Sequence, residues 1–148
     1  MPLYEDHEFE ASARELRRLL GIEFQHRPDM ITVIIKLKDR GLIKNYERVP
    51  DEQMAGNEAY FDPEKGILYI SESTFEAGNG FFAIESKRQR ARFTLGHEVG
   101  HIWLKHQGLR YRGKSGELQE KLVRQIKQEE REAHRFAGAF LAPSYLAE

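Results

Sequence analysis

The sequence predicts an α+β fold, with helices at the N-terminus, a small antiparallel sheet, and two packed helices that carry a metal site. Apolar residues recur at helical spacing near both ends of the chain. Short runs of β-branched and aromatic residues, separated by turn residues, lie between these helical segments. Two histidines four residues apart, His97 and His101, stand within an apolar run of helical spacing. Together these three observations predict the fold class.

The composition predicts one globular domain over residues 1–148, with 40% hydrophobic and 32% charged residues. The net charge of −1 argues against strong nucleic-acid binding. The absence of cysteine excludes disulfides and thiolate metal ligands. The N-terminus lacks the basic and apolar regions of a signal peptide, and no apolar run is long enough to span a bilayer. We therefore expect a cytoplasmic protein without a membrane partner.

Two helices are predicted before the sheet. The first covers about residues 5–20, where apolar residues recur every three or four positions, and Gly21 follows as a C-cap. Its outer face is expected to be solvated and lined by Arg14, Arg17 and Arg18. The second covers residues 28–40. Its β-branched residues would also suit a strand, but its charged end favours a helix.

The middle of the chain is predicted to form the antiparallel sheet. Its strands are expected at residues 42–49, 59–61 and 67–71. Between the last two strands, Pro63 fixes φ early in a turn and Gly66 can take a positive φ at its exit. The polar residues that follow, up to Gly80, and those between Gly108 and Gly116 are predicted to be loops.

The apolar run in the second half contains the H-E-x-x-H pattern of zinc hydrolases, with His97, Glu98 and His101. On a helix the two imidazoles lie one turn apart on the same face, where both can bind one Zn²⁺. The carboxylate of Glu98 would lie beside the metal and could take a proton from a water there. Gly96 and Gly100 each weaken a helix interior by about 1 kcal/mol, which indicates that another element packs closely against this helix.

This metal helix is predicted to begin at Ser86 and to end near Lys105. Positive charge is unfavourable at a helix N-terminus, yet four basic residues crowd its first turns: Lys87, Arg88, Arg90 and Arg92. Either the helix begins earlier or these residues have acidic partners. His106 is expected to be an ordinary histidine at the helix end. A core helix with two hydrogen-bonded histidines is the alternative without a metal.

A catalytic zinc site needs a third protein ligand, which the predicted helix over residues 116–141 can supply. Its inward stripe passes through Glu130, and a carboxylate on an otherwise apolar stripe needs a partner. Glu130 is therefore the predicted ligand. The alternatives on the same helix are Glu129, Glu132 and His134. His134 could instead hydrogen-bond a ligand from outside the metal sphere, whereas Glu129 and Glu132 are most simply solvent-facing charges.

Two segments of the chain resemble the ImmA/IrrE metallopeptidase family. Residues 92–101 are similar to the family pattern R-x-F-T-L-A-H-E-L-G-H, and residues 130–143 to E-x-x-A-N-x-F-A-x-x-L-L-x-P. Two departures from it matter: Gly96, where Ala is usual, and His134, where Asn is usual. The resemblance implies a gluzincin-like α+β domain with a zincin-like metal site and Glu130 as the third ligand. It also implies cleavage of a repressor, which releases genes of a mobile element or a stress response.

The residues and the resemblance together predict a zinc-dependent endopeptidase. Zn²⁺ would be held by His97, His101 and Glu130, and Glu98 would act as the base. The partner is expected to be a protein substrate, in particular a transcriptional repressor. The alternative is a non-catalytic, zinc-containing regulatory or protein-binding module, which would lack an open coordination position. A DNA-binding regulator that uses the N-terminal helices is a third hypothesis, against which the net charge argues.

Overall fold

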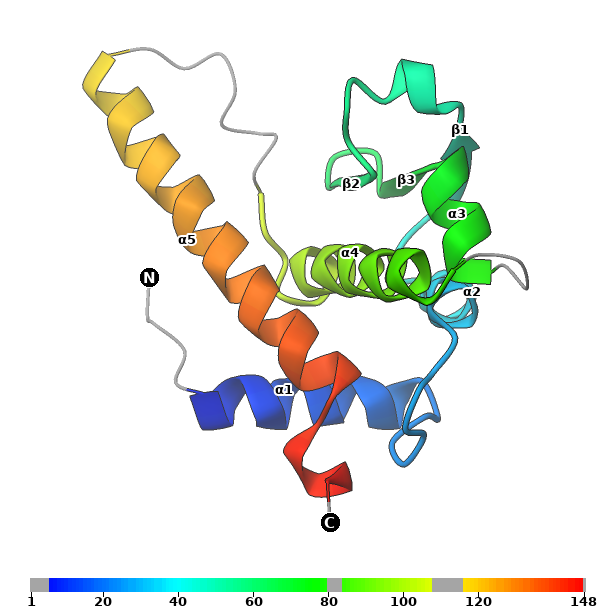
Figure 1. The fold of residues 1–148 in the computed structure, drawn as a ribbon. Coiled ribbons are helices and arrows are strands. Elements are labelled where there is room, and N and C mark those ends of the chain that lie inside the picture. Colours follow the sequence, from blue (N-terminus) through cyan, green and yellow to red (C-terminus); the bar gives the residue numbers. More distant parts are fainter. Residues whose placement is uncertain (1–5, 80–83, 108–115, 148) are drawn as a thin grey trace.

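A computed structural model describes residues 6–79, 84–107 and 116–147. In this part of the chain the fold is α+β, as predicted, with helices and a small three-stranded sheet that lies at one side of the molecule (Figure 1). The helices are α1 (Asp6–Leu19), α2 (Met30–Asp39), α3 (Glu72–Asn79), α4 (Glu85–Trp103) and α5 (Gly116–Leu141). The strands are β1 (Asn45–Val49), β2 (Ala59–Asp62) and β3 (Ile67–Ser71). The loop predicted between Gly108 and Gly116 lies, except for its last residue, outside the described residues.

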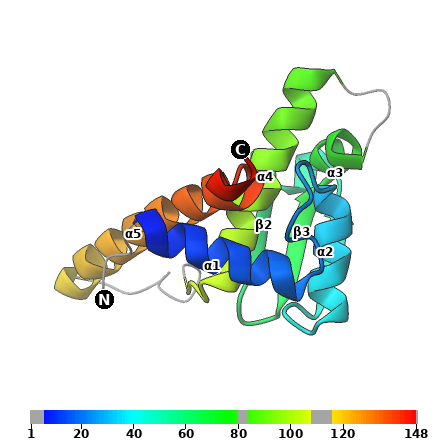
Figure 2. The ribbon, with the colours of Figure 1, turned by 90° about the horizontal axis from the view of Figure 1, so that it is seen from below.

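α4 runs through the middle of the molecule, with α5 on one side and the sheet, α2 and α3 on the other (Figures 1 and 2). The core lies where α1, α2, α4 and α5 meet next to β3. Its largest apolar side chains are fully buried and include Leu16, Ile34, Leu68, Leu95, Phe136 and Phe140. Within the described ranges, no helix is both long and apolar enough to cross a membrane.

The two N-terminal helices form as predicted. α1 buries Phe9, Ala13 and Leu16 on one face and contacts α5. α2 begins after Asp29, whose side chain accepts a hydrogen bond from the Ile31 N–H at 3.2 Å. The segment is thus a helix and not a strand, and its N-cap satisfies one of the backbone N–H groups that a helix start leaves unpaired.

Arg17 does not lie on a solvated face, so that prediction is wrong. Its side chain is fully buried. The guanidinium donates to the Phe140 carbonyl at 3.2 Å, to the Ile22 carbonyl at 3.1 Å and to the Gln25 carbonyl at 2.6 Å. These carbonyls belong to the end of α5 and to the turn after α1, where backbone acceptors have no helical partner. A buried cation is therefore satisfied by backbone oxygens rather than by water.

The sheet has the strand order β1-β3-β2 and is mixed, not wholly antiparallel as predicted. β2 and β3 form the predicted antiparallel hairpin. β1 pairs with β3 in parallel, with Asn45 opposite Ile67. The connection after β1 contains a short 3-10 helix, Asp51–Gln53, and crosses to the far side of β3 before β2 begins. β2 is therefore an edge strand, and it contacts α4.

The segment after β3 is a helix, α3, and not the predicted polar loop. Ser71, the last residue of β3, caps it: its Oγ accepts the Thr74 N–H at 3.2 Å and lies 2.8 Å from the Thr74 hydroxyl. Serine at an N-cap satisfies the first unpaired donors of a helix. Polar residues that favour loops in isolation thus begin a helix here, and α3 packs against α4.

α4 begins at Glu85, one residue before the predicted N-terminus, and its N-cap Ile84 makes no side-chain cap hydrogen bond. Two of the four basic residues in its first turns have acidic partners, as one of the two predicted alternatives required. Arg88 pairs with Glu85 at 2.7 Å, and Arg90 pairs with Glu58. These exposed ion pairs offset the unfavourable position of positive charge at a helix N-terminus.

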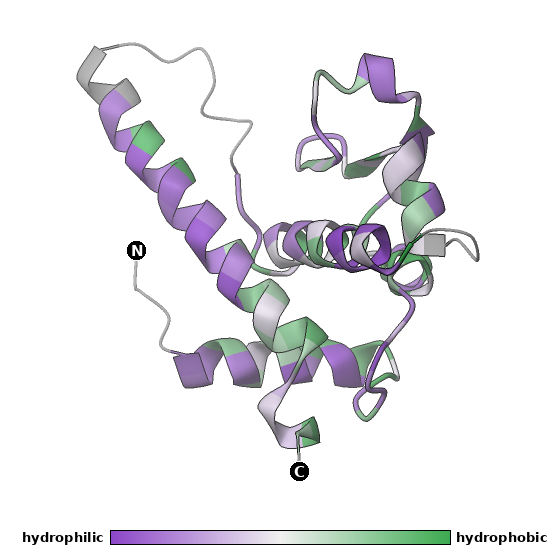
Figure 3. Ribbon diagram, in the orientation of Figure 1, coloured by the Kyte–Doolittle hydropathy of each residue, from purple (hydrophilic) through white to green (hydrophobic). Residues whose placement is uncertain are grey.

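α4 and α5 approach closely because α4 carries glycine at the crossing. A Cβ on Gly100 would lie 3.0 Å from the Cα of Ala133 and 3.1 Å from its carbonyl oxygen. The predicted close packing of another element at Gly100 is thus confirmed. Figure 3 shows that α5 is mainly hydrophilic along its N-terminal half and more hydrophobic where it crosses α4 and α1. The crossing therefore lies at the boundary between a polar and an apolar part of α5.

Candidate metal centre

The crossing brings the two histidines of α4 against one carboxylate of α5. The Nε2 atom of His97 lies 2.8 Å from Glu130 Oε2, and the Nε2 atom of His101 lies 3.0 Å from Glu130 Oε1. The structure thus brings together the three side chains that the sequence proposed as metal ligands. Two imidazole nitrogens and a carboxylate oxygen are a donor set that Zn²⁺ accepts.

The geometry of the cluster fits a bound cation. Zinc–ligand bonds of about 2.0–2.1 Å place the ligand atoms of a tetrahedral site roughly 3.3 Å apart. The two nitrogen–oxygen distances of 2.8 and 3.0 Å need only a small opening to reach that separation. One donor atom from each of His97, Glu98 and His101 lies within 4.8 Å of the others, so this group also could hold a metal.

The charges in the cluster support the same conclusion. Hydrogen bonds from His101 and His97 hold the pKa of Glu130 far below its ordinary value, so this carboxylate is ionised. Burial would lower the pKa of His101, but the hydrogen bond to Glu130 and the negative charges of Glu98 and Glu130 outweigh it and raise this pKa. The site therefore favours a positive charge next to Glu130, which a metal cation can supply.

Glu98 lies beside this cluster and is only 8% exposed. Its Oε1 accepts a hydrogen bond of 2.9 Å from the backbone N–H of Phe61 on β2. Burial raises the pKa of Glu98 to about 7, against the opposing positive charges of His101 and His97. A carboxyl group with a pKa near neutrality can both accept and release a proton at cellular pH.

A cavity of about 340 Å³ opens onto these side chains. His97, Glu98, His101 and Glu130 form one part of its lining, and residues 59–61 of β2 form another. Ile126 of α5 also lines the cavity. The site therefore lies between the edge of the sheet and α5, with polar and apolar groups facing the same space.

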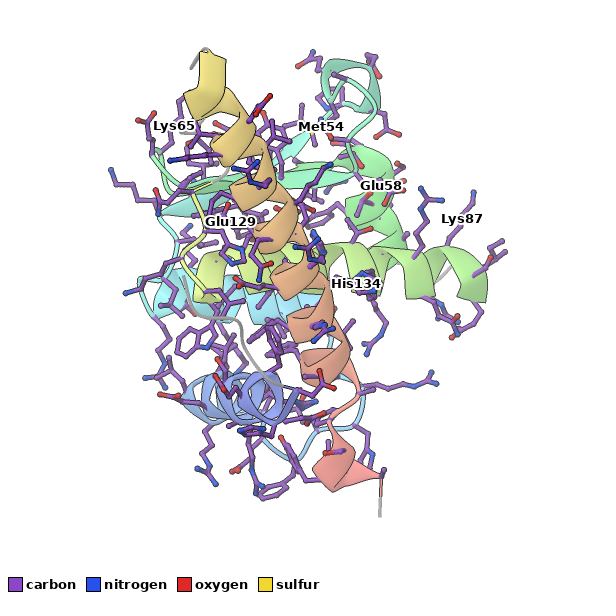
Figure 4. The ribbon with its side chains drawn as sticks, turned by 90° about the vertical axis from the view of Figure 1, so that its left-hand side faces the viewer. Met54, Glu58, Lys65, Lys87, Glu129 and His134 are labelled. Atoms are coloured by element: carbon purple, nitrogen blue, oxygen red, sulfur yellow. The ribbon has the colours of Figure 1, made fainter. Side chains whose placement is uncertain are left out.

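His134 is not among the described residues that line this cavity. It is exposed, and its ring packs edge-on against Phe93 with ring centroids 4.9 Å apart. Figure 4 shows His134 and Glu129 on different sides of α5. The structure therefore does not bring His134 to the two histidines of α4, where a fourth ligand would have to lie.

Three buried polar side chains next to the site were not predicted from the sequence: Glu129, Glu132 and His106. Glu129 and Glu132 are each only 2% exposed, so the prediction that they face solvent is wrong. His106 is 4% exposed and is not an ordinary histidine at a helix end. Its Nε2 lies 2.8 Å from Glu132 Oε1, and its Nδ1 lies 2.9 Å from the Nδ1 of His101. Glu129 Oε2 accepts the N–H of Gln107 at 3.1 Å.

A spacing signal for these carboxylates is present in the sequence. Glu129 and Glu132 stand three apart, and Ala133, Phe136, Ala137 and Phe140 continue the same interval of three or four residues. All six of these side chains are buried. Glu130 belongs to the edge of this stripe, where the helix surface meets the cavity.

An H-E-x-x-H helix crossed by a second helix that supplies a glutamate, beside an edge strand, defines a domain of the metallopeptidase type. The chain belongs to the IrrE N-terminal-like domain family, a peptidase family whose model matches residues 46–146. This confirms the resemblance found in the sequence. Searches of curated proteins and of solved structures returned no match. α1 and α2 lie outside the matched residues, although α1 packs against α5 within them.

Proposed function

We propose that this protein is a zinc-dependent endopeptidase of the cytoplasm that cleaves a regulatory protein, in particular a transcriptional repressor. The observation that carries the proposal is the contact of His97 Nε2 and His101 Nε2 with the two oxygens of Glu130, next to the buried Glu98. Membership of a peptidase family supports it. In this proposal residues 1–148 act as one domain.

The metal would be held by Nε2 of His97, Nε2 of His101 and the carboxylate of Glu130. When bound, Zn²⁺ supplies Lewis-acid chemistry, which polarises a peptide carbonyl and makes a water molecule more acidic. This donor set contains one ionised carboxylate and, in the metal-binding form, two neutral imidazoles. Such a set suits a cation with two positive charges.

Glu98 would handle the protons of the reaction. Its Oε1 is held by the Phe61 N–H, which fixes the plane of the carboxylate against the cavity. The group would accept a proton from the attacking water and later deliver it to the amine nitrogen of the departing peptide. A pKa of about 7 suits both steps, because neither protonation state is strongly favoured at neutral pH.

The edge strand β2 offers a way to bind the substrate backbone. The Glu58 and Asp62 carbonyls accept hydrogen bonds from Ser71 and Gly66, so the alternate residues of β2 direct their backbone groups toward β3. The groups of Ala59 and Phe61 therefore face the opposite side, where the Phe61 N–H meets Glu98 and the cavity lies. An extended peptide can add to such an edge as a further strand.

The alternative of a non-catalytic zinc module requires a fourth protein ligand that closes the site. His134, one of the alternative ligands predicted on α5, would be a candidate for this role, but its contact with Phe93 favours the catalytic hypothesis instead. We therefore propose the open site, with substrate and water in the remaining position.

The test is cleavage of a protein substrate. The zinc-loaded protein would be incubated with the proteins encoded beside it and with a proteome-derived peptide library, and new termini would be read by mass spectrometry. We expect defined cleavage sites that Glu98→Gln abolishes while the variant still binds zinc. Equal cleavage by the Glu98→Gln variant would contradict the proposal, and so would no cleavage of any protein or peptide by the wild type.

A further inference from the structure

His106 follows α4 in a tight turn that folds it back beneath His101. The His106 N–H donates to the His101 carbonyl at 3.0 Å, and the Lys105 N–H donates to the Ile102 carbonyl at 3.3 Å. This is the hydrogen-bond pattern of a Schellman motif, in which the residue after the C-cap takes a left-handed conformation. That residue is Lys105, with φ 58°, where glycine would be usual. The turn therefore has a strained backbone at Lys105, and it places the ring of His106 against the ring of His101.

The ring of His106 connects His101 to a buried carboxylate of α5. The two Nδ1 atoms of His101 and His106 lie 2.9 Å apart. On the other side of the ring, Nε2 lies 2.8 Å from Glu132 Oε1. The second oxygen of Glu132 accepts a hydrogen bond of 2.9 Å from Gln128 Nε2. His106 and Glu132 are only 4% and 2% exposed, so these contacts are largely shielded from solvent.

The positions of the protons follow from the types of atom in this chain. An ionised carboxylate only accepts hydrogen bonds, so Nε2 of His106 must carry a proton toward Glu132. In a neutral imidazole the other nitrogen then has a lone pair, so Nδ1 of His106 accepts. His101 must therefore donate from its own Nδ1. When a cation replaces the proton that His101 shares with Glu130, the remaining proton of His101 is on Nδ1 and the lone pair is on Nε2, the atom that lies against Glu130.

We propose that Glu132 and His106 are positioning residues that set the tautomer and the ring orientation of His101 for metal binding. The inference rests on the proposed function, because it takes His101 as a metal ligand. Metal-bound histidines commonly donate their second N–H to a carboxylate or carbonyl, which fixes the ring and strengthens the ligand. Here the imidazole of His106 lies between the ligand His101 and the carboxylate of Glu132. Helix α5 thus contributes both Glu130, which lines the cavity, and Glu132, which contacts the far side of the His106 ring.

Zinc affinity, measured by competition with a chelator, tests the proposal without a substrate. His106→Phe keeps a ring but removes the acceptor for His101, and we expect zinc binding about 10–100-fold weaker. His106→Asn should restore much of the loss, because its amide oxygen can take the place of Nδ1. Glu132→Gln should also weaken binding. Glu129→Gln is the matched control, since it changes an equally buried carboxyl group on the same helix whose hydrogen bond goes to the Gln107 N–H and not to His106.

The ¹⁵N NMR spectrum of the zinc-loaded protein gives a second readout. His106 should carry its proton on Nε2, and His101 should carry one on Nδ1 that exchanges slowly with solvent. A proton on Nδ1 of His106 would overturn the proposal. So would equal losses of zinc affinity in Glu129→Gln and Glu132→Gln, or a folded His106→Phe variant that binds zinc as tightly as the wild type. If His106→Phe does not fold, Glu132→Gln and the NMR assignment decide.

The His97→Ala variant separates this proposal from the proposed function. If zinc binding by the wild type does not depend on His97, the metal site itself is wrong. If binding depends on His97 but is unaffected by the changes at His106 and Glu132, the metal site stands and only the positioning role fails.

Discussion

The Glu98 carboxylate accepts its hydrogen bond from the backbone N–H of Phe61 at 2.9 Å, so the H-E-x-x-H helix is tied directly to the edge strand of the sheet. This single contact joins the proposed base to the strand on which a peptide would lie. The hydrogen bond replaces only part of the solvation that Glu98 loses at 8% exposure, so burial outweighs it and raises the pKa of Glu98.

We predict that Glu98 makes the metal-free protein less stable as the pH rises. Burial raises the pKa of Glu98 from 4.5 to about 7 in the folded state. Between these two values the unfolded chain has released the proton while the folded protein still holds it, so the free energy of unfolding falls as the pH increases. The effect ends above about pH 7 and amounts to roughly 3 kcal/mol at most.

Glu98→Gln should remove this dependence. Urea unfolding of the metal-free proteins should show the variant gaining stability over the wild type from pH 4.5 to 7. Glu47→Gln, the same change at an exposed position, serves as the control and should follow the wild type. A constant difference between Glu98→Gln and the wild type over this range would contradict the prediction.

We predict opposite outcomes for alanine at the two glycines of the metal helix. At Gly100 a Cβ would meet the backbone of Ala133 at 3.0 Å, so α4 and α5 must separate. Overpacking of this kind costs about 1–3 kcal/mol, and it should also weaken zinc binding because Glu130 moves with α5. The measurements are urea unfolding and chelator competition.

Gly96→Ala is the matched control for this change. Its Cβ would meet Leu141 Cδ1 at 3.0 Å, the end of a flexible side chain that can move aside. Alanine gains up to about 1 kcal/mol over glycine in a helix interior, so stability should stay equal or rise. A Gly100→Ala variant as stable as Gly96→Ala would show that the helices are not in backbone contact.

We predict that Lys105→Gly stabilises the protein. Lys105 has φ 58°, a conformation that costs a residue with a Cβ roughly 1–2 kcal/mol. Glycine removes that strain but is more flexible in the unfolded chain, so a gain of about 0.5–1 kcal/mol in unfolding free energy is expected. Lys44→Gly, at an exposed position without a positive φ, should lose stability instead. A loss at Lys105 as large as that at Lys44 would contradict this interpretation.

The sequence was sufficient for the parts of the site that follow from helical spacing. His97 and His101 share a face because they are four residues apart. Glu130 was identified as a carboxylate on the inward stripe of α5, although the buried stripe passes through Glu129 and Glu132 and leaves Glu130 at its exposed edge. The start of α2 was likewise predicted to within two residues of its position at Met30, and the structure identifies Asp29 as the N-cap.

The parts that were not predicted depend on contacts between distant segments. Glu132 and His106 are 26 residues apart, and each makes burial of the other favourable. Taken alone, a glutamate is expected to face water. Arg17 is buried because the end of α5, 123 residues away, presents the Phe140 carbonyl to it. The strand order also depends on a crossing connection that local propensity does not encode.

Zinc-edge anomalous diffraction from crystals grown with zinc tests the metal site most directly. We predict a single strong peak between His97 Nε2, His101 Nε2 and the Glu130 carboxylate, at about 2.0–2.2 Å from each ligand atom. A fourth position should be open to the cavity beside Glu98. A peak elsewhere, or a site closed by a fourth protein side chain, would contradict the proposed peptidase.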